Sequence, residues 1–292
     1  MKENSDMKRI GLTLLALTLS TVPVDASSTD KKIEQLKKES IQGHTYLMHR
    51  TLQMNQSSSK EIVSIFKKKR DSFFNDYIIR VHELKNGKWK ESYEKVIKEQ
   101  HDVKFITAGL IGKYEHTVVG YKSGSRNFLN SYLIGSKDGE TIKTIQTKEG
   151  LLMGNAKIAK RSLYYLNRSI TLNKYSYKKN KLVSTGQPTG QDDRIVAEQP
   201  EVWLGLEQLL GRAKYVGKHT YTVHVGDRIG IGRHQLTDTK DYEYSLHSKG
   251  HYTMDWDFSK VSLLTKKPGT TYLILSPGPE EKTVDIEIIV KK

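Results

Sequence analysis

Turn signals at regular spacing constrain this chain more than any other feature, because they divide residues 73–185 into short segments of strand composition. Asn86-Gly87 and Asp138-Gly139 each separate two segments in which apolar and polar residues alternate, the strongest short-range signal for a β-hairpin. Further turn residues stand at 123–125 (Ser-Gly-Ser), 167–169 (Asn-Arg-Ser) and 178–180 (Lys-Lys-Asn). This punctuation predicts a central antiparallel β domain over residues 73–185, arranged as a sheet, a sandwich or part of a propeller.

The preceding segment, residues 27–72, is polar and predicts a short helical lead. Ser, Thr and Asp at positions 28–30 resemble a helix start, and a second start is predicted at Ser59. The apolar residues that would line the faces of these helices are Ile33, Leu36 and Ile41 in the first and Ile62, Ile65 and Phe66 in the second. The basic run 67–70 would then form the last turn of the second helix, where the macrodipole favours positive charge.

Residues 186–211 predict a boundary made of a linker and a short amphipathic helix. The stretch 186–199 is rich in Gly, Pro and acidic residues, and Pro200 occupies a position suited to the first turn of a helix. The apolar stripe of that helix would be Val202, Trp203, Leu206, Leu209 and Leu210, ending at Gly211. We expect this helix to dock between two β parts.

The remaining residues, 212–292, consist of strand and turn segments, and "LLTKKPGTTYLIL" at 263–275 predicts a hairpin. The order of "VHVGDRIGI", a mid-domain Trp256 and "KPGT" before a penultimate strand resembles bacterial Ig-like domains of the group 2 type. The stretch "IGRHQLTDTKDYEY" is more polar than that family's pattern. The resemblance implies a C-terminal Ig-like β-sandwich that acts as a spacer or adhesive module without catalysis.

The central region carries a second resemblance, through "KNGKWKESYEKV" and "HTVVGYKSGSRNFLNSYLIGSKDGETIKTI". These stretches resemble one blade of the FG-GAP or VCBS type. Such blades carry an Asp-rich calcium loop before the "VVG" strand, but here residues 109–115 contain one carboxylate and one lysine. Calcium needs several oxygen ligands, so the resemblance implies a blade that lacks its calcium site.

The first 26 residues predict a secretory signal peptide. Lys8 and Arg9 precede an apolar stretch at 10–19, and the small residues before position 27 predict cleavage after Ala26. An apolar stretch of ten residues is far shorter than the roughly 20 that a transmembrane helix requires. The absence of cysteine excludes disulfides, so core burial must stabilise the secreted chain. This composition is typical of Gram-positive secreted proteins.

The formal net charge of +15 favours an anionic partner, which could be nucleic acid, anionic lipid or a cell-wall polymer. Outside a Gram-positive cell, the nearest polyanion is a wall polymer such as teichoic acid. The densest basic runs give the candidate anion-binding residues Lys67, Lys68, Lys69, Arg70, Lys178 and Lys179. Scattered lysines that keep sheet edges soluble and unpaired are the alternative interpretation of the same charge.

No motif in the sequence defines a reaction, a metal site or a cofactor. "GDRIGIGR" only partly matches a dinucleotide-binding loop and has the composition of a strand. His247 and His251 have no marked third ligand, so we predict no zinc site. Asp255 and Asp257 are interpreted as solvent-side acids that flank Trp256. Tyr and Lys alternate near residue 175, a pattern shared by half-buried strands and by platforms for single-stranded nucleic acid or sugar polymers.

The sequence therefore predicts a secreted, non-enzymatic binding or structural protein of the bacterial envelope. Its predicted partner is an anionic wall polymer or an extracellular protein, and the signal peptide argues against nucleic acid. The alternative is a secreted hydrolase or enzyme inhibitor with a cleft in the central domain, where Glu83, Glu94, His101 and Glu115 would converge. A membrane-active effector would need an apolar amphipathic hairpin, which the sequence pattern does not predict.

Overall fold

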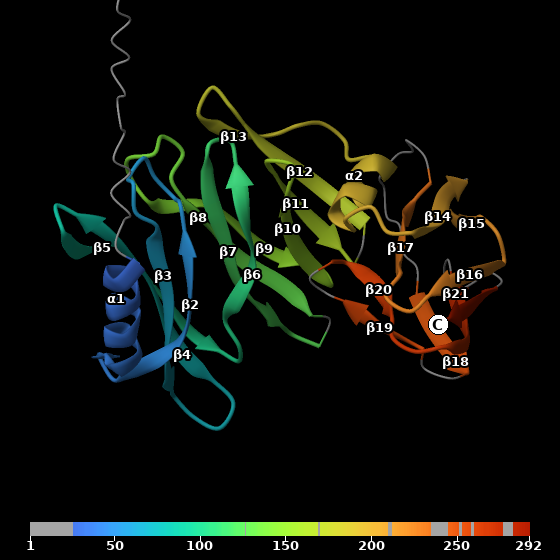
Figure 1. Cartoon of the computed structure of the whole chain (residues 1–292), viewed down its shortest axis with the longest axis horizontal. Coiled ribbons are helices and arrows are strands. Elements are labelled where there is room, and N and C mark those ends of the chain that lie inside the picture. Colours follow the sequence, from blue (N-terminus) through green and yellow to red (C-terminus); the bar gives the residue numbers. More distant parts are fainter. Residues whose placement is uncertain are drawn as a thin grey trace, which may run out of the picture.

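The structure is a computed structural model in which two helices accompany 22 strands within the described residues. These residues are 26–125, 127–168, 170–209, 212–234, 245–250, 253–257, 260–276 and 283–292. The predicted mainly-β class is confirmed (Figure 1). The predicted signal peptide lies outside the described residues, except that Ala26 is the first residue of helix α1 (Ala26–Lys38).

Three antiparallel meanders, sheets A, B and C, follow one another along the chain. Sheet A contains β1 (Ser40–Ile41), β2 (His44–Leu52), β3 (Glu61–Lys69), β4 (Asn75–Lys85) and β5 (Lys88–Gln100). Sheet B contains β6 (Lys104–Ile111), β7 (Tyr114–Ser123), β8 (Phe128–Gly135) and β9 (Lys143–Leu151). Sheet C contains β10 (Gly154–Ala159), β11 (Ser162–Asn167), β12 (Ile170–Lys178) and β13 (Lys181–Ser184). In all three, each strand pairs with the next one in sequence.

The predicted turns account for this order. Lys85 pairs with Lys88 across Asn86-Gly87, and both turn residues have positive φ, 52° and 72°. Positive φ at both central positions defines the two-residue hairpin turn that matches strand twist, and Asn-Gly is its preferred sequence. The connections β7–β8, β8–β9, β11–β12 and β12–β13 also fall at predicted turns.

The three sheets stack face to face, and apolar side chains fill the space between them (Figure 1). Sheet B lies in the middle and is buried on both faces. Its residues Val119 and Ile134 pack toward sheet A, whereas the neighbouring Val118 and Leu133 pack toward sheet C. Successive side chains on a strand point to opposite faces, so each strand of sheet B serves two cores.

The predicted second helix of the lead is wrong, because residues 61–69 form strand β3 in the middle of sheet A. The spacing of Ile62, Ile65 and Phe66 fits a helical stripe, but it arises here from a strand with both faces buried. Val63 and Ile65 face sheet B, and Ile62 and Phe66 face the opposite way, where α1 covers them. A strand buried on both faces has a nearly continuous apolar run, which periodicity alone does not distinguish from a helix.

Of the predicted lead, residues 26–38 are helical, as expected, whereas Ile41, assigned to the stripe of that helix, lies in β1 and residues 44–52 form β2. Helix α1 packs Leu36, which is fully buried, and Ile33 against the outer face of sheet A. The basic run 67–70 is not a last helical turn. Lys67, Lys68 and Lys69 end β3, and Arg70 begins the turn toward β4.

The boundary region also differs from its prediction. The helix α2 (Gly190–Val196) lies in the predicted linker and begins with a capping box between Thr189 and Asp192. Residues 202–209, predicted as a helix, form strand β14. Leu204 and Leu206 alternate into a core there while Trp203 points the other way, so the strand period of two prevails.

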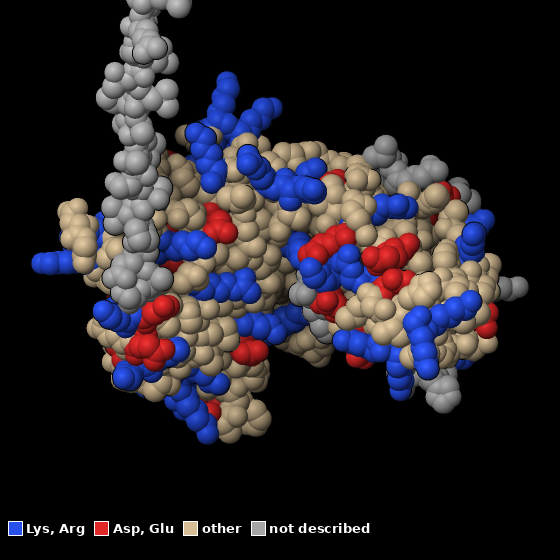
Figure 2. Space-filling view, in the orientation of Figure 1, with Lys and Arg blue, Asp and Glu red and all other residues tan. Residues whose placement is uncertain are grey.

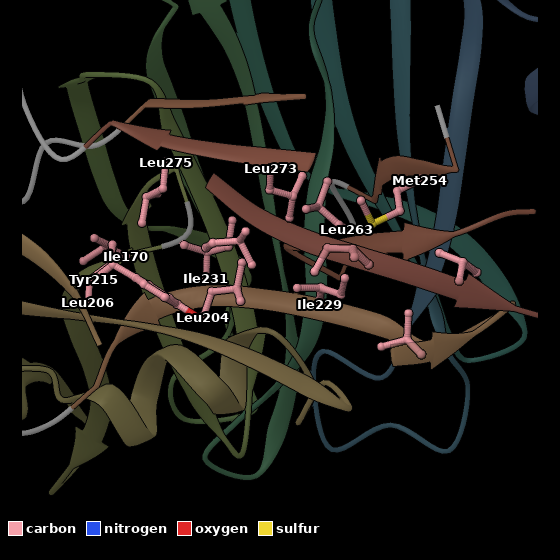
Figure 3. Close-up of a cluster of buried hydrophobic side chains, with 14 residues drawn as sticks. Ile170, Leu204, Leu206, Tyr215, Ile229, Ile231, Met254, Leu263, Leu273 and Leu275 are labelled. Atoms are coloured by element: carbon pink, nitrogen blue, oxygen red, sulfur yellow. The ribbon is translucent and has the colours of Figure 1, made fainter. Parts of the chain in front are cut away.

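The C-terminal part is a sandwich of two sheets, D and E. Sheet D has the order β15 (Arg212–Val216), β14 (Val202–Leu209), β17 (Arg228–Arg233), β20 (Ser262–Thr265), β19 (Met254–Asp257). Sheet E has the order β16 (Thr220–His224), β22 (Val284–Lys291), β21 (Gly269–Ser276), β18 (Ser245–Gly250). Side chains from both sheets interleave in one core, shown in Figure 3, which Ile170 of sheet C also joins. This architecture is compatible with an Ig-like sandwich.

The predicted hairpin at 263–275 is wrong. Strand β20 belongs to sheet D and β21 to sheet E, so the turn that contains Pro268 crosses the sandwich and does not join paired neighbours. The apolar segments on either side of the turn still face each other, because Leu263 and Leu273 meet in the common core. Composition predicts two strands and a turn here, but does not predict which strands pair.

A buried ion pair joins sheet C to the sandwich. Arg233 of β17 is fully buried and holds Asp193 of α2 through two contacts, Nε to Oδ2 at 2.9 Å and Nη2 to Oδ1 at 2.8 Å. The same guanidinium donates to the carbonyl oxygens of Pro188 and Thr171. Nearby, Glu198 binds Lys157 of sheet C and both Lys260 and Arg228 of the sandwich.

Candidate anion-binding site

A basic pocket of about 240 Å³ lies at one end of the sheet stack. The β2–β3 loop, the β6–β7 turn, the β8–β9 loop and the β12–β13 turn bring its walls together. Its lining residues are Gln56, Ile111, Gly112, Lys113, Tyr114, Lys137, Asp138, Tyr177, Lys179 and Asn180. In Figure 2, basic side chains gather along this upper edge, over the β12–β13 turn of Figure 1.

Three exposed lysines, Lys113, Lys137 and Lys179, surround the pocket. Each comes from a different turn or loop, and within the described part of the chain none of them forms an ion pair with a carboxylate. Ammonium groups without a protein counter-ion attract anions from solution, and a concave site concentrates their field. The pocket is therefore suited to an anionic group.

Asp138 is the one carboxylate among the lining residues, and its Oδ1 is already engaged by the protein. This oxygen accepts hydrogen bonds from the Ser136 hydroxyl at 2.9 Å and from the backbone N–H groups of Glu140 and Thr141 at 3.0 and 3.3 Å. Donation from the Glu140 N–H, with that from Ser136, lowers the pKa of Asp138 to about 2. Asp138 therefore stabilises the β8–β9 loop, and the pocket keeps an excess of positive charge because it contains three lysines and one carboxylate.

Tyr177 forms part of the floor, and a buried histidine orients its hydroxyl. Nδ1 of His116 lies 2.9 Å from the Tyr114 carbonyl oxygen, and Nε2 lies 3.1 Å from the Tyr177 hydroxyl. Burial lowers the pKa of His116 to about 4, so the ring is neutral near pH 7. Because a carbonyl only accepts, Nδ1 carries the proton and Nε2 accepts from the Tyr177 hydroxyl, which holds the tyrosine in place beside the pocket.

Gly139 allows two of the loops to meet. Its φ is +83°, and a Cβ at this position would collide with the hydroxyl of Tyr114 and the side chain of Gln56. The Gln56 N–H donates to the Gly139 carbonyl at 3.1 Å, and the Gln56 side-chain amide donates to the Asp138 carbonyl at 3.2 Å. Only glycine satisfies both the backbone conformation and the close approach.

Three glutamates fix the β2–β3 loop that carries Gln56. Glu61, fully buried, accepts from the Met54 N–H at 2.6 Å and from the Ser57 hydroxyl at 3.0 Å. Glu83, also buried, accepts from the side-chain amide of Asn55 at 2.6 Å. Burial raises the pKa of Glu61 above 4.5, the value of a free side chain.

The third glutamate, Glu115 of β7, links this loop to sheet B. Its carboxylate accepts from the backbone N–H of Gln53 at 2.7 Å, and its own N–H donates to the Gln53 carbonyl at 2.8 Å. The loop is thus anchored from sheets A and B at once. One wall of the pocket is preorganised before any ligand binds.

The six predicted anion-binding residues separate into two groups. Lys67, Lys68, Lys69 and Arg70 lie at the end of β3 remote from the pocket, whereas Lys178 and Lys179 lie at the β12–β13 turn. Of these, only Lys179 lines the pocket. Lys113 and Lys137 are isolated lysines that no charge run marks, so sequence reasoning missed them; their positions in turns were the available signal.

The four residues of the alternative cleft do not converge. Glu83 binds Asn55 and Lys85, Glu94 pairs with Arg80 at 2.6 Å, and Glu115 binds Gln53. The His101 ring stacks on Phe74 with its centroid 4.7 Å away, at the remote end of sheet A. Each of the four side chains thus contacts a different set of neighbours and stabilises its own part of the fold.

Among the described residues, no group of three or more His, Cys, Asp or Glu side chains is placed to hold a metal ion. His251 and the side chain of His247 lie outside the described residues. Asp255 is exposed on β19, whereas Asp257 is partly buried and accepts from the Lys260 N–H at 3.2 Å. Trp256 between them packs against the sandwich core.

Comparisons of the chain with protein-family models, with curated proteins and with solved structures found no match. In the part of the chain that the structure describes, no helix has the length and apolar character needed to cross a membrane.

Proposed function

We propose that the protein is a secreted, non-enzymatic binding protein of the bacterial envelope, retained on an anionic wall polymer through the basic pocket. The observation that carries the proposal is the convergence of Lys113, Lys137 and Lys179 from three separate loops around one cavity. The net charge of +15 supplies the long-range attraction, and the pocket supplies a point of close contact. The predicted signal peptide supports the location outside the cell.

The size and lining of the pocket favour one repeat unit of such a polymer. A cavity of about 240 Å³ has the volume of roughly eight water molecules in the liquid, enough for one phosphorylated or carboxylated sugar or polyol unit. The amides of Gln56 and Asn180 and the hydroxyl of Tyr177 stand beside the lysines. Such groups hydrogen-bond polyol hydroxyls while the ammonium groups neutralise the anion.

For the sandwich, we propose an Ig-like domain of the group 2 bacterial type that acts as a spacer. The Val-Gly-Asp segment forms the β16–β17 turn, where Asp227 accepts from the His224 N–H at 2.7 Å. The Lys-Pro-Gly-Thr segment leads into β21, the penultimate strand. These placements support the resemblance, and the joint through Arg233 gives a spacer of fixed direction.

The test compares two triple variants that remove the same charge. Lys113→Gln, Lys137→Gln and Lys179→Gln alter the pocket, and Lys218→Gln, Lys266→Gln and Lys267→Gln remove three exposed lysines of the sandwich. Binding is measured by co-sedimentation with Gram-positive sacculi, with and without teichoic acid, over a salt series. We expect the parent to need teichoic acid and to release at high salt, because exposed charges are screened.

The pocket variant should bind at least about tenfold more weakly than the control variant, which corresponds to the loss of about 1.4 kcal/mol at close contacts. Equal weakening in both variants would reject the pocket and leave only diffuse attraction by the whole surface. No binding of the parent at low salt would reject retention on the polymer altogether.

A further inference from the structure

The turn between β3 and β4 exposes two adjacent phenylalanines to solvent. Phe73 is 69% exposed, the highest value among the large hydrophobic side chains that the structure describes, and Phe74 is 38% exposed. Neither belongs to a described apolar cluster. Single exposed apolar residues are common, but two adjacent aromatic rings at the end of a sheet form a small apolar surface that calls for a partner.

Hydrogen bonds fix the backbone of the turn, from which Phe73 extends into solvent while the Phe74 ring lies against His101, with the ring centroids 4.7 Å apart. Asp71 Oδ1 accepts from the backbone N–H groups of Phe73 and Phe74, both at 2.7 Å. The N–H groups of Arg70 and Asp71 both donate to the Phe74 carbonyl, at 3.1 and 3.2 Å. Donation from the Phe74 and Phe73 N–H groups also lowers the pKa of Asp71, so it remains an acceptor under mildly acidic conditions.

Basic residues outnumber acidic ones in the strand ends and connections that meet at this turn, although Lys104 pairs with Asp102 at 3.9 Å. The basic groups near the turn are Lys67, Lys68, Lys69, Arg70, Lys98 and Lys104, and the acidic groups are Asp71, Asp76, Glu99 and Asp102. Arg70 is neutralised by Glu99 at 2.9 Å and lies 3.8 Å from Asp76. Lys68 and Lys69 are exposed and form no ion pair within the described residues.

We propose that this turn, residues 70–74, docks on the surface of an anionic lipid bilayer. The two rings would enter the boundary between headgroups and acyl chains, and Lys68 and Lys69 would contact the anionic headgroups. Apolar rings beside lysines are the combination that binds proteins to the interface without spanning the membrane. Basic residues near the surface gain from its negative potential.

The shape of the turn favours a bilayer over a protein partner. A narrow convex turn at the end of a sheet presents too little area for a stable protein interface, which buries at least about 1,200 Å² in total. A bilayer needs only a few inserted side chains. In Figures 1 and 2, this end of sheet A forms the lower edge of the molecule, opposite the pocket edge.

The test uses co-sedimentation with phosphatidylglycerol vesicles, with phosphatidylcholine vesicles for comparison. The double variant Phe73→Ser/Phe74→Ser is matched by Val96→Ser/Val225→Ser, which alters two residues that are 44% and 43% exposed elsewhere. We expect the parent and the matched control to bind phosphatidylglycerol. The phenylalanine variant should bind at least about tenfold more weakly, because the inserted apolar area is lost.

A fluorescent variant, Phe73→Trp, tests insertion directly. Bromine on the acyl chains should quench its emission relative to that of the parent, whose tryptophans all lie outside this turn. The pocket triple variant should bind vesicles as the parent does, which separates this site from the polymer site. Absence of vesicle binding, unchanged binding by the phenylalanine variant, or dimerisation that depends on the two rings would overturn the proposal.

Discussion

Both joints of the molecule contain apolar contacts, but they differ in their buried charge. Sheets A and B meet mainly through apolar side chains such as Ile79 and Ile134, whereas the joint of sheet C with the sandwich adds the buried pair of Arg233 and Asp193 to its apolar contacts. Apolar contacts are non-directional, so the first joint gains stability from burial without demanding one geometry. The guanidinium at the second joint must satisfy four hydrogen bonds at once, so it fixes the direction of the sandwich relative to the stack.

The two joints contribute different properties to the protein. Burial of continuous apolar surface makes the stack stable, but packing alone tolerates small shifts between sheets. A buried ion pair adds little net stability over an apolar pair of similar volume, and it is costly to break. Apolar burial therefore stabilises both joints, and the ion pair adds a directional constraint at the joint between sheet C and the sandwich.

The largest effect should come from breaking the polar joint. We expect Asp193→Asn to lower the free energy of unfolding by about 3–5 kcal/mol, because it leaves the charge of Arg233 buried without compensation. Urea denaturation measures this. The control, Asp285→Asn, breaks an exposed pair with Lys249 and should cost at most about 1 kcal/mol. Equal costs for the two variants would contradict the assigned role of the joint.

The apolar joint gives the next effect. Ile134 is fully buried between sheets A and B, and we expect Ile134→Ala to cost about 2–5 kcal/mol through lost burial and the cavity left behind. Val96→Ala, at a residue 44% exposed on the same stack, should change stability by no more than about 0.5 kcal/mol. If Ile134→Ala unfolds at the same urea concentration as Val96→Ala, the two sheets are not held by this core.

Acid should also weaken the stack. Burial lowers the pKa of both His82 and His116 from 6.5 to about 4. The unfolded chain therefore binds protons more readily, so the stability they contribute is complete above pH 6.5 and is lost as the pH falls toward 4. Hydrogen exchange at pH 7 and pH 5 should show faster opening of sheets A and B at the lower pH.

The variant His116→Gln tests whether His116 causes this loss of stability. The measurement is the change in the free energy of unfolding with pH, which is informative even if the variant is less stable than the parent at pH 7. The variant should lose less stability than the parent between pH 6.5 and pH 4. An unchanged slope would show that His116 does not titrate with unfolding in this range.

The sequence predicted the local features of the fold and missed those that depend on distant contacts. Asn86-Gly87 predicts its turn because Asn and Gly adopt positive φ angles more readily than other residues, whatever surrounds them. The helix predicted at Ser59 failed because burial on both faces gives β3 the spacing of a helical stripe. The capping box of Thr189 and Asp192 was readable in the sequence as Thr-x-x-Asp, inside a segment whose composition suggested a linker.

The candidate site was less predictable than the fold. Its lining extends from Gln56 to Asn180, and no single stretch of sequence contains more than one of the three lysines. Charge runs identified Lys179 and the group at 67–70, but they do not reveal which isolated lysines share a cavity. The pair of Arg233 and Asp193 is similarly separated, by 40 positions.

The pattern of strand pairing has a consequence for the order in which the chain folds. In sheets A, B and C each strand pairs with its immediate successor, so each sheet can form as soon as its own residues are available. In sheet E, β16 pairs with β22, so Thr220 cannot pair until Glu287, 67 positions later, is available. Because a chain is synthesised from its N-terminus, the pocket can be complete while the sandwich is still open, and the sandwich closes last.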